Sequence, residues 1–127
     1  MSYVYAYIDG SDLETLVEPL TRTFGQLTTQ WSALGAIFVN QKNDRSANVR
    51  PGDLPDWELG INLPLERFGA NQALELLAFS KSLSQSTGRE IVVGVADALG
   101  VTEDVVILGV NAGDREYRAL LTHLAGL

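Results

Sequence analysis

Two runs of aliphatic, largely β-branched residues constrain the fold of this chain more than any other feature. They are Ile91–Ala96 and Val105–Val110, within the segment EIVVGVADALGVTEDVVILGV. Runs of this length and composition predict strands that are buried on at least one face, in the middle of a sheet. The short polar break between them predicts a hairpin turn, bounded by solvated acids at Asp97 and at 103–104.

Three further segments have the pattern of strands. Tyr3–Ile8 alternates small aliphatic residues with three tyrosines, a period of two. The aliphatic side is expected to face the core, and the tyrosine side to pack or to stay half exposed for a partner. Trp31–Val39 is interpreted as a second strand, with Gly35 as a site for a bulge. A third strand starts at Trp57, alternates apolar with polar residues and ends at Pro64.

The first helix is predicted from a capping box, Ser11 to Glu14, that precedes a helical stripe of apolar residues. Pro19 lies inside the stripe and is expected to kink the helix or to confine its regular part to two turns. Gly25 is the expected stop.

Two more helices follow from the same kind of pattern. One is expected to begin near Leu65 or Asn71 and to run to Ser84, with Gly88 closing its end. The last is expected to start at Asp114 as its N-cap. Its buried stripe consists of Tyr117, Leu120, Leu121 and Leu124.

The order β-α-β-β-α-β-β-α predicts one α+β domain over residues 1–127, with a mostly antiparallel sheet of about five strands. Its first six elements match the split β-α-β, ferredoxin-like arrangement, which places both helices on one face. The last strand and helix would extend the sheet edge. A doubly wound parallel sheet fits less well, because no helix separates the second strand from the third.

Charge and composition exclude several classes of function. Nine basic and sixteen acidic residues give a net charge of −7, which disfavours nucleic acid and anionic lipid as partners and favours cationic ones. No segment approaches the ~18–20 apolar residues of a membrane span, and the N-terminus lacks a secretory signal, so a cytoplasmic location is expected.

The residue types that usually form catalytic and metal sites are scarce in this chain. The chain has no cysteine and one histidine, His123, and it lacks phosphate-binding glycine motifs and a nucleophile elbow. We therefore predict no metal and no cofactor, and interpret His123 as a structural or surface residue.

An acidic cluster is the strongest candidate site. Antiparallel pairing of the first and third strands would bring the end of one beside the start of the other. The candidate residues are Asp9, Asp12, Asp53, Asp56, Glu58 and Trp57. They are interpreted as partner-binding residues, with strand and helix caps or an acid–base pair as alternatives.

The segment Asn40–Pro55 has no periodicity and is long for a loop. It carries three basic residues, Lys42, Arg45 and Arg50, which are candidates for anion binding. A solvated hairpin loop explains the same composition.

These patterns favour a small acidic protein-binding domain over an enzyme. Size, acidity and missing catalytic residues are shared with bacterial immunity proteins, an analogy of character. The expected partner is a protein with a basic surface, for example a toxin that this chain would inhibit. Self-association through strand edges or tyrosines stays open. The alternative is a ligand-binding or enzymatic domain that uses the 40–55 loop and the acidic cluster.

Overall fold

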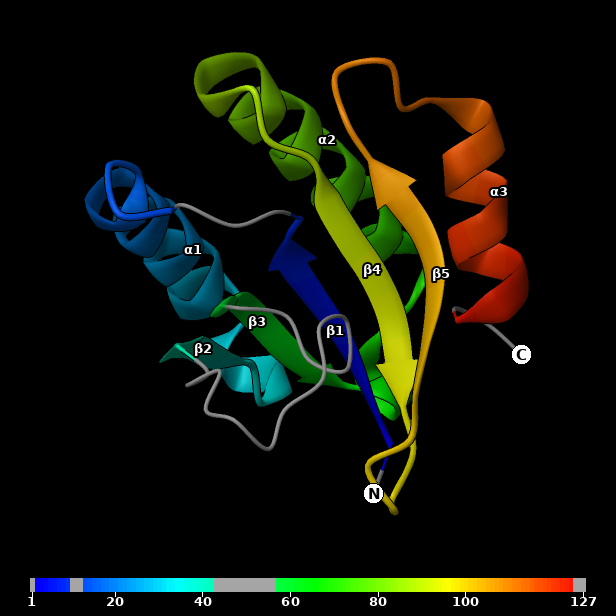
Figure 1. Cartoon of the computed structure of the whole chain (residues 1–127). Helices are drawn as coiled ribbons and strands as arrows, with labels where there is room; N and C mark the ends of the chain where they lie inside the picture. Colours follow the sequence, from blue (N-terminus) through cyan, green and yellow to red (C-terminus); the bar gives the residue numbers. More distant parts are fainter. Residues whose placement is uncertain (1, 10–12, 43–56, 125–127) are drawn as a thin grey trace.

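The computed structural model describes residues 2–9, 13–42 and 57–124. Within these ranges the chain forms one antiparallel sheet and three α-helices, in the predicted order (Figure 1). The elements are β1 (Tyr3–Ile8), α1 (Val17–Gln30), β2 (Ile37–Lys42), β3 (Trp57–Pro64), α2 (Ala70–Thr87), β4 (Ile91–Ala96), β5 (Thr102–Leu108) and α3 (Asp114–His123). No helix of the described part is both long and apolar enough to cross a membrane.

The sheet has the strand order β2-β3-β1-β4-β5, and every neighbouring pair is antiparallel. This is the predicted split β-α-β core, with β5 added beside β4. The tyrosine strand β1 therefore occupies the centre. β5 forms an edge, which confirms the prediction that the last strand extends the sheet, so the expectation that both apolar runs lie in the middle of the sheet holds only for β4. The first residues of β5, Thr102, Glu103 and Asp104, are polar and exposed, and only Leu108 at its end is buried.

The three helices cover one face of the sheet, where a single apolar core forms (Figure 1). Strands β1, β3 and β4 contribute alternate residues to this core, as the period of two requires, whereas β5 buries only Leu108 and β2 adds the partly buried Phe38. From the strands the core receives Val4, Ala6, Ile8, Leu59, Ile61, Leu63, Ile91, Val93 and Leu108. From the α-helices it receives Leu20, Phe24, Leu27, Ala73, Leu76, Leu83 and Leu120.

Helix α1 differs from its prediction at both ends. It begins at Val17, and Ser11 of the predicted capping box lies outside the described residues. Pro19 stands in the first turn, where a missing N–H leaves no helical hydrogen bond unmade. Gly25 lies within the helix, which continues to Gln30.

The prediction that a strand starts at Trp31 is also wrong. Trp31 caps α1 and is buried, and its Nε1 donates a hydrogen bond of 2.5 Å to Oε2 of Glu75 in α2. A 3-10 turn, Ser32–Leu34, follows, and Gly35 ends it with a φ of 89°. Gly35 is thus a cap rather than a bulge. Strand β2 begins only at Ile37.

The other helices follow their predictions more closely. Helix α2 is preceded by a 3-10 turn at Leu65–Arg67 and continues to Thr87, beyond the predicted Ser84; Gly88, with a φ of 73°, closes it as predicted. Helix α3 is capped by Gly113 rather than by Asp114, because the side chain of Glu116 accepts the Gly113 N–H at 2.8 Å.

Candidate functional site

The side of the sheet opposite the core carries the tyrosines of β1, and none of the described helices covers it (Figure 1). We call this side the open face. Residues that pair across antiparallel strands point to the same side, so the register defines rows across it. The Tyr5 row consists of Ile37, Asn62, Tyr5, Gly94 and Asp104. The Tyr7 row consists of Val39, Gly60, Tyr7, Val92 and Ile107.

The two central tyrosines are fixed against the sheet. Their rings stack with centroids 5.2 Å apart and an interplanar angle of 27°. The Tyr5 hydroxyl donates to Oδ1 of Asp104, and the Tyr7 hydroxyl donates to Oδ1 of Asn62 at 2.6 Å. Asp104, predicted as a solvated turn residue, is therefore a hydrogen-bond acceptor of the open face. Tyr5 is buried and Tyr7 is half buried, which makes the pair a rigid platform.

Glycine at two positions makes room for this platform. A Cβ at Gly94 would overlap the Tyr5 hydroxyl and the carbonyl oxygen of Glu103. A Cβ at Gly60 would overlap the carbonyl oxygen of Ala6 and would lie 2.8 Å from Cδ1 of Tyr7. The tyrosine rings and the backbone of β1 therefore depend on neighbours without side chains.

Both phenols are held in the protonated form. Burial raises the pKa of Tyr5, and the hydrogen bond to Asp104 and the charge of that carboxylate raise it further. Burial also raises the pKa of Tyr7, with smaller contributions from Tyr3 and Glu58 and an opposing one from the Asn62 hydrogen bond. At neutral pH both hydroxyls act as hydrogen-bond donors.

These raised pKa values predict a loss of stability in alkali. An unfolded tyrosine releases its proton near pH ~10, whereas Tyr5 and Tyr7 in the folded protein retain theirs. The contribution of the two tyrosines to the free energy of unfolding is complete below about pH 10. It falls as the pH rises above that value, because the unfolded state then binds fewer protons than the folded state. We expect urea unfolding at about pH 11 to give a lower free energy than at about pH 8.

The variant Tyr5→Phe is the control for this effect, since it removes one of the two shifted groups. Its stability should fall less steeply over the same pH range. A wild-type slope that Tyr5→Phe leaves unchanged would show that other groups cause the alkaline loss.

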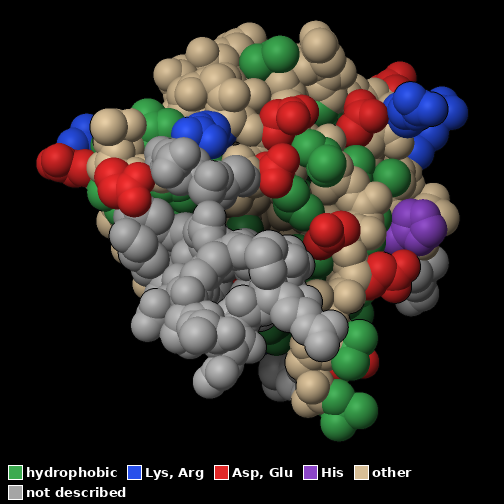
Figure 2. Space-filling model, in the orientation of Figure 1, with side chains coloured by type: hydrophobic (Ala, Val, Ile, Leu, Met, Phe, Trp, Pro, Cys, Tyr) green, Lys and Arg blue, Asp and Glu red, His purple; other side chains and the backbone are tan. Residues whose placement is uncertain are grey.

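Acidic residues border the open face. The Asp9 N–H donates to the carbonyl oxygen of Glu90 at 2.8 Å, so the end of β1 adjoins the start of β4, and both side chains are exposed. Asp104 of the Tyr5 row is exposed on β5, whereas the neighbouring Glu103, also exposed, pairs with Val95 and so belongs to the side of the sheet that carries Val4. Figure 2 shows acidic side chains gathered over the β4 and β5 part of this face, with apolar side chains between them.

The residues of the predicted acidic cluster are only partly described. Asp9 follows β1 and Glu58 lies in β3, and the antiparallel register carries both to the same end of the sheet, as expected. Trp57 opens β3 and Lys42 closes β2, but their side chains are not described. The remaining predicted residues, Asp12, Asp53, Asp56, Arg45 and Arg50, lie outside the described residues.

The sequence interpretation missed Asn62 and Gly60 of the rows, whereas the close approach of Tyr5 to Gly94 agrees with the interpretation of Gly94 as a close-approach glycine. The signal for the rows was present in the alternation of Tyr3, Tyr5 and Tyr7, but their cross-strand partners depend on strand register. Among the described residues no group of three or more His, Cys, Asp or Glu is arranged to hold a metal ion.

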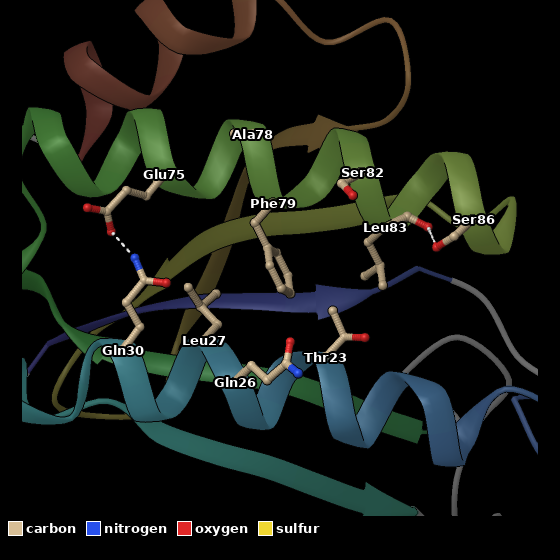
Figure 3. Close-up of a pocket in the computed structure, with 10 residues that line it drawn as sticks. All are labelled: Thr23, Gln26, Leu27, Gln30, Glu75, Ala78, Phe79, Ser82, Leu83 and Ser86. Atoms are coloured by element: carbon tan, nitrogen blue, oxygen red, sulfur yellow. Dashed lines mark hydrogen bonds between the residues drawn. The ribbon is translucent and has the colours of Figure 1, made fainter.

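A groove of 560 Å³ lies between α1 and α2, on the helical side of the molecule (Figure 3). Leu27, Phe79 and Leu83 form its apolar part, and hydroxyl and amide side chains line the rest. Its one charged lining residue, Glu75, already accepts hydrogen bonds from Gln30 at 3.1 Å and from Trp31 at 2.5 Å. The polar groups of this groove therefore connect α1 to α2, and the open face is the stronger candidate for a functional site.

Comparison with protein-family models, with curated proteins and with solved structures gives no significant match to this chain. The function is therefore argued from the geometry and charge of the open face.

Proposed function

We propose that this chain is an acidic protein-binding domain without catalytic activity, which masks a basic surface of another protein in the manner of an inhibitor or immunity protein. The observation that carries the proposal is the open face: a rigid tyrosine platform with an acidic border. The proposed contact surface comprises the exposed members of the two rows, Ile37, Asp104 and Ile107, together with Asp9 and Glu90, above the buried Tyr5 that supports them.

The shape of the open face supports a protein partner. Apolar side chains stand at both margins, since Ile37 on β2 is 64% exposed and Ile107 on β5 is 50% exposed. Tyr7 is partly exposed and already hydrogen-bonded, so it loses little conformational freedom on binding, which lowers the entropy cost of association. Exposed aliphatic side chains beside exposed carboxylates, as at Ile107 and Asp104, are a combination found in protein interfaces.

The charge of the border supports a basic partner. Asp9, Glu90 and Asp104 are exposed, and the whole chain carries a net charge of −7. Such a field accelerates encounter with a cationic surface and disfavours acidic competitors. The ligand-binding or enzymatic alternative depends on Arg45 and Arg50, outside the described residues, so no described contact supports it.

Affinity capture with paired charge variants tests the proposal. The tagged wild-type protein should recover a basic protein from the lysate of its source cells and release it at high salt. The variant Asp9→Lys/Glu90→Lys should recover at least about tenfold less, because it places positive charge on the border of the open face. Mass spectrometry identifies and quantifies the proteins that the wild type and the variant recover.

The matched control is Glu18→Lys/Glu66→Lys, which changes the net charge equally at exposed positions in α1 and in the 3-10 turn before α2. It should recover as much partner as the wild type. Equal recovery by all three proteins, or binding that salt does not weaken, would refute the proposed electrostatic role of the open face.

A further inference from the structure

We propose that the free edge of β5 receives an extended segment of the basic partner as an added antiparallel or parallel strand. The inference rests on the proposed function and specifies how the partner is held. Its ligand class is a strand-forming segment in which Lys or Arg alternates with apolar residues.

The backbone of β5 is available on one side. Among the described residues β5 pairs only with β4, so its outer edge presents N–H and C=O groups without a ladder partner. A trough of 510 Å³ runs beside this edge. Four consecutive residues of β5, Asp104–Ile107, form one wall, and Arg115, Glu116 and Ala119 of α3 form the other. The trough gives an added strand a place beside the backbone.

Apolar side chains along this edge offer contacts to the same segment. Ile107 is 50% exposed, and Val110, just beyond the strand, is 44% exposed. In strand addition, backbone hydrogen bonds supply affinity, and contacts with alternate side chains supply specificity. A segment with apolar residues at every second position fits this edge.

The charges decide which segment fits. Glu103 and Asp104 are exposed on β5, and Asp114 is exposed at the start of α3, whereas Arg115 is the one basic residue that lines the trough. The opposite edge strand, Ile37–Lys42, contains no acidic residue. The β5 edge therefore attracts a basic strand more strongly than the β2 edge does.

The same charges disfavour a second copy of this chain as the occupant. A second copy would bring its own net charge of −7 and its exposed Glu103 and Asp104 to the contact, and this like charge opposes association.

A strand-forming peptide tests the inference directly. The probe is a short synthetic peptide that alternates Lys with Val, added to the isotope-labelled full chain and followed by amide hydrogen exchange and NMR. We expect slower exchange at amides of residues 102–108 and intermolecular backbone contacts to β5. The same peptide with N-methylated backbone positions, which cannot complete a ladder, should give no protection. A Glu–Val peptide should bind at least about tenfold more weakly.

Charge reversal at the edge gives the second readout. Glu103 is exposed, and Glu103→Lys should weaken binding of the Lys–Val peptide about tenfold, whereas Glu66→Lys should leave it unchanged. Thermal unfolding of both variants verifies that the sheet is intact.

The remaining outcomes separate this inference from the proposed function. Peptide effects confined to the residues of the Tyr5 and Tyr7 rows that lie outside β5, or no peptide binding, would overturn strand addition. The proposed function would stand if Asp9→Lys/Glu90→Lys still lost the captured partner. Protection of β5 that grows with protein concentration without peptide, together with a dimer mass in light scattering, would make a second copy the occupant and would also overturn the inference.

Discussion

Replacing Gly60 by alanine is expected to cost more than about 4 kcal/mol of stability, comparable with the total of about 5–15 kcal/mol typical of a native domain. The added Cβ would overlap the carbonyl oxygen of Ala6 and lie 2.8 Å from Cα of Tyr7. Both atoms belong to the backbone of the central strand β1, so no side-chain rotation relieves the clash. Urea unfolding followed by circular dichroism measures the loss.

Gly25→Ala is the matched control, because it adds the same methyl group in α1. Apart from its chain neighbours and the backbone of its own helical turns, no atom lies within 4 Å of a Cβ at Gly25. Alanine should stabilise the helix by about 0.5–1 kcal/mol through its higher helix propensity. The same chemical change is thus expected to have opposite signs at the two glycines. A Gly60→Ala protein with the unfolding midpoint of the wild type would show that β1 and β3 do not approach each other as described.

The fold was predictable where the determining pattern is local. The boundaries of β1 and β4 follow from apolar residues within six-residue segments, and the split β-α-β order follows from the sequence of elements. The prediction failed at Trp31 because its position is set by Glu75, 44 residues away in the chain. Tryptophan is a residue type common in strands, but the hydrogen bond from Trp31 to Glu75 of α2 holds this side chain outside the sheet.

The candidate site was predictable to a smaller extent. The alternation of tyrosine with aliphatic residues in β1 predicted that Tyr5 and Tyr7 lie on the same face of the sheet. The excess of acidic residues in the chain predicted a negative charge for the surface around them. Their partners Asp104 and Asn62 are 99 and 55 residues away, and only the strand register brings them together. The polar start of β5, Thr-Glu-Asp, was the available signal that this strand lies at an edge, because a central strand would bury those residues.

Phe24→Ala is expected to cost about 3–5 kcal/mol, the range for deletion of a buried aromatic side chain. Phe24 is fully buried in α1, and its ring meets Phe79 of α2 edge to face, with centroids 5.1 Å apart and an interplanar angle of 61°. The substitution leaves a cavity and also removes an aromatic pair worth about 0.5–1.5 kcal/mol. Chemical unfolding followed by tryptophan fluorescence, to which the buried Trp31 contributes, measures the loss.

Leu74→Ala is the control for Phe24→Ala, because Leu74 lies on α2 and is 50% exposed. Its truncation removes less buried apolar area and should cost under about 1 kcal/mol. Because α1 and α2 contact the core side of the sheet, Phe24→Ala should lower stability without changing the charge or the exposed residues of the open face. Partner capture by this variant, measured where it remains folded, should equal that of the wild type. Loss of capture from the folded variant would instead place the α1–α2 layer in the binding mechanism.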